Sequence, residues 1–109
     1  MSDLTPLHEA LLELGLEDLI PLPEVFHTPE VRPLVEGGPA VRLVSRALLD
    51  LLARGRIQVW SGQWWEDPHL ASRVDAEKLL LDERRYSFDL EQTGLERVYF
   101  VNVANYHVD

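Results

Sequence analysis

The sequence predicts an α+β fold, in which helices pack on a small antiparallel sheet. Two observations indicate this class. A helical pattern over residues 41–54 changes directly into a strand pattern from residue 56. Residues 97–103 form a second strand with apolar side chains on both faces, which is typical of a central strand covered twice. We therefore expect these two strands to pair within one sheet.

The helix over residues 41–54 is predicted from an apolar stripe and from the signals at its two ends. Apolar side chains recur at spacings of three and four residues and so share one face: Val41, Val44, Leu48, Leu51 and Leu52. Pro39 suits the first helical turn, and Gly55 suits a left-handed C-cap. After Gly55 the period changes to two, which predicts a strand over residues 57–60.

Shorter elements are expected before this helix. Thr5 is a candidate N-cap for a helix over residues 4–14, with a proline at its first position. Residues 19–22 fit a short edge strand, because the proline within them cannot donate to an interior ladder. Residues 23–26 open a short helix and residues 28–35 add one further turn, since the prolines here exclude a long helix.

Three further elements are expected after the first of the two strands. Residues 61–63 should form a turn. Asp75 is a candidate N-cap for an inserted helix near residues 75–83. Residues 86–90 alternate between apolar and polar and so predict another strand. The whole is then three to four helices on a sheet of three to four strands.

Length and composition predict one domain and a cytoplasmic location. The 109 residues suit a single domain over residues 1–109 with one core. No cysteine is present, and no apolar run is long enough to span a membrane. The acidic start, Met1-Ser2-Asp3, lacks the basic and apolar regions of an export signal.

The net charge of −9 is distributed unevenly along the chain. Residues 1–31 contain seven acidic side chains and neither Lys nor Arg, residues 32–56 carry a net charge of +3, and residues 57–109 carry −5. An acidic surface repels phosphate backbones and attracts basic proteins. The same charge also keeps a small protein soluble, so that explanation stays open beside the functional one.

Two stretches resemble motifs of a known group of proteins. Residues 18–25 contain Asp-Leu-Ile-Pro-Leu-Pro-Glu-Val, and residues 48–57 contain Leu-Leu-Asp-Leu-Leu-Ala-Arg-Gly-Arg-Ile. They resemble small, mostly uncharacterised winged-helix-like proteins of actinobacteria and related bacteria. Leu19 stands where that group usually has an aromatic residue, and Arg56 stands where a Leu is common. The resemblance implies a winged-helix-like fold and, as for some members, an immunity or accessory role in a bacterial toxin system.

The first functional hypothesis is a module that binds another protein. Trp64 and Trp65 are adjacent, so a strand easily buries only one of them and leaves the other as a partner anchor. Glu9, Glu13 and Glu17 are candidates for docking a basic partner, such as a nuclease toxin. The alternatives are that the last strands cover both tryptophans and that the glutamates form a solvated helix face.

The second hypothesis is a DNA-binding transcriptional regulator. Arg42, Ser45, Arg46 and Leu49 follow the i, i+3, i+4, i+7 spacing of one helix face, opposite the apolar stripe. Arg and Ser can hydrogen-bond base edges in a major groove. A solvated helix face explains the same residues, and Leu49 suits a protein contact better than DNA.

The sequence gives no sign of an enzyme, a cofactor or a metal. The four histidines show no metal-ligand spacing, and no nucleophile elbow or phosphate-binding loop is present. We therefore expect a non-enzymatic protein. A third hypothesis is a homodimer formed through the last strand at a sheet edge.

Overall fold

The computed structural model confirms the predicted α+β class. It describes residues 4–16, 19–63, 67–86 and 97–106. The described strands form one antiparallel sheet, in the order β1 (Ile20–Pro21), β4 (Arg97–Asn102), β2 (Ile57–Gly62) and β3 (His69–Leu70). The winged-helix arrangement itself stays a prediction.

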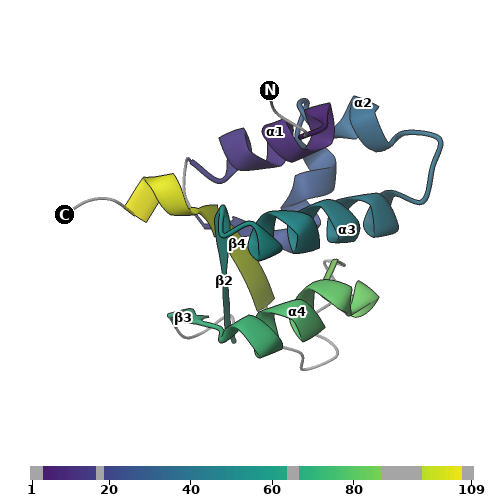
Figure 1. The fold of residues 1–109 in the computed structure, drawn as a ribbon. Helices are drawn as coiled ribbons and strands as arrows, with labels where there is room; N and C mark the ends of the chain where they lie inside the picture. The colour runs from purple at the N-terminus through teal and green to yellow at the C-terminus, as the bar shows by residue number, and fades with distance from the viewer. Residues whose placement is uncertain (1–3, 17–18, 64–66, 87–96, 107–109) are drawn as a thin grey trace.

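The helices lie in layers around one central helix. The α-helices of the described residues are α1 (Pro6–Leu14), α2 (Arg32–Val35), α3 (Ala40–Ala53) and α4 (Arg73–Leu81). Three 3₁₀ helices complete the described elements: η1 (Leu22–His27), η2 (Glu83–Tyr86) and η3 (Val103–Tyr106). Figure 1 shows α3 between α1 above it and α4 below it. Both outer helices therefore pack against α3.

The junction from α3 to β2 forms as the sequence predicts. Gly55 has φ 72°, a left-handed conformation that is easy only for glycine. Its N–H donates to the carbonyl of Leu52 at 3.0 Å, and the N–H of Arg56 donates to that of Leu51 at 2.9 Å, as in a Schellman motif. The chain therefore turns straight from helix into sheet. At the other end, Pro39 is the N-cap rather than a residue of the first turn.

Strand β4 is central, as its two apolar faces predict. It pairs with β2 along its whole length, including Val59 opposite Phe100, and with β1 on its other side. Phe100 is fully buried and Val101, on the opposite face, is almost fully buried. The predicted pairing of the two strands and the edge position of β1 are both confirmed.

Helix α1 begins at the predicted cap and ends against the sheet. The N–H of His8 donates to Thr5 Oγ1 at 3.2 Å, and Pro6 is the first helical residue. At the other end, the N–H of Asn102 donates to the carbonyl of Gly15 at 3.1 Å. The Asn102 side-chain amide donates to the carbonyl of Leu12 at 2.9 Å. These bonds satisfy carbonyls at the helix end and fix α1 to β4.

The inserted helix predicted near residues 75–83 is present as α4, but its first residue differs from the prediction. Helix α4 begins at Arg73, and Ser72 is its N-cap, accepting a hydrogen bond from the N–H of Asp75 at 3.2 Å. Asp75 lies inside the first turn, where a carboxylate is favourable next to the helix dipole. Ser72 and Asp75 are both cap-forming types three residues apart, so the sequence alone allows either start.

Two further boundaries differ from the prediction. Ser61 and Gly62 continue β2 instead of forming a turn, because they pair with Val98 and Arg97 of β4. Tyr86 ends η2 instead of starting a strand. The rest of that expected strand, residues 87–90, lies outside the described residues.

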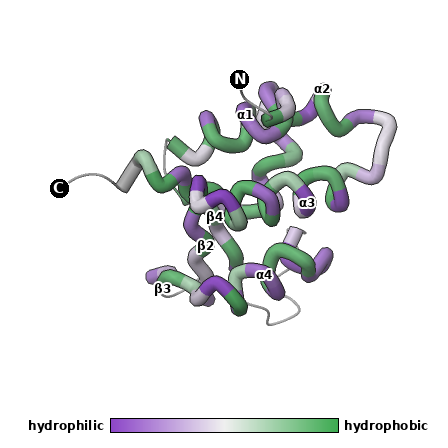
Figure 2. Tube along the Cα trace, viewed as in Figure 1, coloured by the Kyte–Doolittle hydropathy of each residue, from purple (hydrophilic) through white to green (hydrophobic). Residues whose placement is uncertain are grey.

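The buried side chains form one cluster to which α1, α3, α4, β2 and β4 all contribute. Leu48 and Leu51 of α3 lie at its centre with no exposed surface. Figure 2 shows hydrophobic stretches along α1 and α3. The apolar stripe of α3 therefore faces the core as predicted, except that Val41 is only partly buried.

We predict that Gly15→Ala destabilises the fold, because a Cβ at this position would lie 2.8 Å from the backbone nitrogen of Asn102. The cost should be about 1–3 kcal/mol, measured by chemical denaturation. Gly38→Ala is the matched control, since its Cβ would meet nothing closer than 3.4 Å. It should change stability by about 0.5 kcal/mol or less. Equal stabilities of the two variants would contradict the close approach of α1 to β4.

Candidate functional site

A polar contact holds α4 against α3. The hydroxyl of Ser45 donates to the carbonyl oxygen of Leu80 at 2.7 Å, and the hydroxyl of Tyr86 donates to the same oxygen at 2.6 Å. Leu80 lies in the last turn of α4, where carbonyls lack a helical donor. Burial raises the pKa of Tyr86, so its hydroxyl stays protonated and remains a donor.

This contact corrects the predicted recognition face of α3. Ser45 is buried against α4, so its hydroxyl cannot reach the edge of a base. Leu49 is only partly exposed and packs at the margin of the core. Arg42 and Arg46 remain exposed. The four residues therefore do not form one open face, and only the two arginines extend into solvent.

A groove lies where this face meets the end of α4. It has a volume of about 290 Å³, and its lining consists of Val41, Arg42, Ser45, Arg46, Leu49, Leu81 and Glu83. We call it the α3–α4 groove. Its apolar side chains come from both helices, and its two cations come from α3. Sequence reasoning missed the groove because it treated this side of α3 as open and did not place α4 against it.

The acidic surface predicted for the N-terminal part is present on α1. Glu9 and Glu13 are exposed, one helical turn apart, and neither forms an ion pair within the described part of the chain. Like charges at this spacing repel each other on a helix. Glu24 and Glu30 are also exposed and unpaired within the same residues. Glu17 lies outside the described residues, as do Trp64 and Trp65.

His8 fixes the orientation of this acidic helix. Its Nδ1 lies 3.0 Å from the backbone N–H of Thr5, which completes a capping box. Its Nε2 lies 2.9 Å from Oδ2 of Asp50 on α3, and Arg54 Nε lies 3.2 Å from the other oxygen of Asp50. Because His8 faces α3, Glu9 and Glu13 face away from it. His8 therefore acts as a capping residue of α1.

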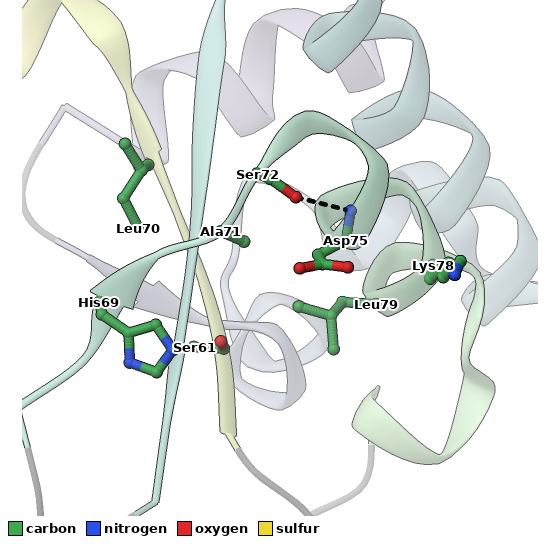
Figure 3. Close-up of a pocket in the computed structure, with 8 residues that line it drawn as sticks. All are labelled: Ser61, His69, Leu70, Ala71, Ser72, Asp75, Lys78 and Leu79. Atoms are coloured by element: carbon green, nitrogen blue, oxygen red, sulfur yellow. Dashed lines mark hydrogen bonds between the residues drawn. The ribbon is translucent and has the colours of Figure 1, made fainter.

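A second recess, of about 320 Å³, lies between β2, β3 and the start of α4 (Figure 3). Its lining consists of Ser61, His69, Leu70, Ala71, Ser72, Asp75, Lys78 and Leu79. His69 lies beside Ser61, its register partner across the two strands. The Ser72 hydroxyl oxygen is occupied by the N-cap hydrogen bond. The other polar groups are the imidazole of His69, the carboxylate of Asp75 and the ammonium of Lys78. Because they differ in charge, the recess favours no particular reaction.

Within residues 4–16, 19–63, 67–86 and 97–106, no group of three or more His, Cys, Asp or Glu side chains is placed to hold a metal ion. The longest helix in that part of the chain, α3, has 14 residues, and none there combines the length and hydrophobicity that crossing a bilayer requires.

Comparison with known proteins returned no matching family model, no similar curated protein and no similar solved structure. The chain's own residues therefore provide the basis for a functional proposal. Two surfaces of the described residues combine exposed charge with no ion pair on one helix face: the glutamates of α1 and the arginines of the α3–α4 groove.

We predict a pH-dependent loss of stability from the turn that ends α4. Asp82 accepts hydrogen bonds from Arg84 and Arg85, which lower the pKa of its carboxyl from 3.8 to about 2. A lowered pKa in the folded state stabilises the fold above the unfolded pKa, and this gain is lost as the pH falls from about 4 through about 2. The loss should be about 1 kcal/mol after screening by solvent.

Chemical denaturation across this pH range, compared between the unmodified chain and Asp82→Asn, measures this contribution. Asp82→Asn should be less stable near neutral pH and should lose less stability on acidification. Glu77→Gln is the control, because its ion pair with Arg73 is exposed. A parallel pH dependence in the unmodified chain and Asp82→Asn would contradict the prediction.

Proposed function

We propose that this protein is a non-enzymatic interaction module that binds a basic protein through the acidic face of α1. The observation that carries the proposal is the exposed pair Glu9 and Glu13, which has no ion-pair partner among the described residues. The first 31 residues contain no Lys or Arg to neutralise such carboxylates. A basic partner would supply the missing charges and would be steered toward this face.

Two structural features support a protein partner. The helix is capped at its start by Thr5 and His8 and bonded at its end from Asn102 to Gly15, so its outer face is presented rigidly. A rigid face loses little conformational entropy when it binds. The competing DNA face of α3 is reduced to Arg42 and Arg46, because Ser45 is buried. Specific DNA binding normally neutralises several phosphates, and two arginines provide little charge for this.

An immunity or accessory role in a toxin system is the finer form of this proposal. Its support is the sequence resemblance at residues 18–25 and 48–57 together with the acidic face of α1. A cationic toxin is the partner class that fits such a face.

We predict that Glu9→Lys/Glu13→Lys reduces capture of the partner. The full-length protein is immobilised and exposed to a lysate of the cells that produce it, and bound proteins are identified by mass spectrometry. The unmodified chain should retain a protein of basic isoelectric point, and the double variant should retain about tenfold less of it. Asp67→Lys/Glu77→Lys makes the same change of charge on exposed residues elsewhere and should retain the partner.

Two results would contradict the proposal. One is the absence of a basic protein among those retained, or its equal retention by Glu9→Lys/Glu13→Lys. The other is salt-sensitive, micromolar binding of a mixed-sequence DNA duplex, measured by fluorescence anisotropy and lost in Arg42→Glu/Arg46→Glu. That second result would favour the DNA-binding regulator.

A further inference from the structure

The α3–α4 groove has an apolar lining that nothing in the described chain covers. Leu81 is 62% exposed, although its neighbour Leu80 is fully buried. Val41 and Leu49 of α3 line the same groove and are partly buried. Figure 2 shows the second half of α4 as a hydrophobic segment next to α3. A leucine-sized side chain placed here would remove apolar surface from water on both helices.

The polar group at the base of this groove already has its partner. The Ser45 hydroxyl donates to the Leu80 carbonyl at 2.7 Å, so it is not left without an acceptor when water is excluded. An apolar occupant can therefore cover Ser45 without leaving a buried donor unpaired.

The groove is lined by two cations, Arg42 and Arg46, and one anion, Glu83, so its local net charge is positive. Arg42 and Arg46 are exposed, lie one helical turn apart, and form no ion pair among the described residues. Both lie in the first half of α3, whose first turn contains no acidic residue and whose N-cap provides no side-chain hydrogen bond. Like charges at this spacing, near the positive end of the helix dipole, are unfavourable in the free protein. Carboxylates from an occupant would relieve this repulsion.

We propose that the α3–α4 groove binds an acidic, amphipathic segment of a partner protein. A leucine-like side chain of the segment would pack between Leu49 and Leu81, and carboxylates beside it would pair with Arg42 and Arg46. A nucleic acid would match the arginines but would leave the apolar lining uncovered. A second copy of this chain, with a net charge of −9, would be repelled as a whole.

This proposal does not rest on the acidic face of α1. Helices α1 and α4 lie on opposite sides of α3 (Figure 1), and the groove is lined by α3, the end of α4 and Glu83. The two surfaces have opposite charge, so they select segments of opposite charge. Loss of binding at one surface should leave the other unaffected, which allows the two proposals to fail separately.

The test is a selection from a random peptide display library against the immobilised full-length protein. Peptides of about twelve residues are long enough to place two acidic residues and one leucine over the groove. Enriched peptides should combine Asp or Glu with Leu, Ile or Phe. Labelled copies should bind about tenfold more weakly to Arg42→Glu/Arg46→Glu, measured by anisotropy, and severalfold more weakly when NaCl is raised from about 50 to about 500 mM.

One further double variant is a control, and one single variant tests the apolar contact. Arg32→Glu/Arg56→Glu makes the same charge change at exposed arginines away from the groove and should bind within about twofold of the unmodified chain. Leu81→Ser should weaken binding severalfold, because it removes apolar contact without changing charge. Thermal unfolding should show that all three variants fold, since the altered side chains are exposed.

Three outcomes would overturn the proposal. The first is a selection that enriches no acidic peptide. The second is peptide affinity that is unchanged in Arg42→Glu/Arg46→Glu. The third is a different occupant: either a DNA duplex that binds through the two arginines more tightly than any selected peptide, or a dimer, detected by light scattering, that dissociates in the same variant.

Discussion

The carbonyl oxygen of Leu80 is the acceptor on which the position of α4 depends. It lies at a helix end and accepts hydroxyl groups from Ser45 of α3 and Tyr86 of η2. An unpaired carbonyl buried at this point would be costly, so these hydrogen bonds favour the packing of the three elements against one another. This packing covers one side of α3 and leaves the exposed Leu81 beside two arginines. It therefore determines which functions the central helix can serve.

Much of the fold could be predicted because its signals are local. Gly55 supplies the left-handed residue that ends α3, and a change of period from 3.6 to 2 marks the strand after it. Thr5 caps α1 through a bond to a residue only three positions away. The central position of β4 followed from apolar side chains on both of its faces. Each of these inferences needs only a few consecutive residues.

The parts that could not be predicted depend on contacts between distant residues. Ser45 and Leu80 are 35 positions apart, so no local sequence pattern predicts that this small polar residue on α3 is buried. The same is true of Ser61, which extends β2 because Val98 is available to pair with it. The candidate site was the hardest part to predict, because a groove formed by two helices has no signature in the sequence of either helix alone. The charge pattern was the exception, since Glu9 and Glu13 could be placed on an outer face from spacing.

The strand order has a consequence for how the chain is made. Strands β1 and β2 lie on either side of β4, which is the last of the described strands in the sequence. While the ribosome synthesises the protein, these two earlier strands have no partner between them until residues 97–102 have emerged. The helices and the β2–β3 pair can form early, but the four-stranded sheet can form only after residues 97–102 have emerged. Translation that stopped before β4 would leave an unassembled sheet, which makes a truncated product a natural target for cellular proteases.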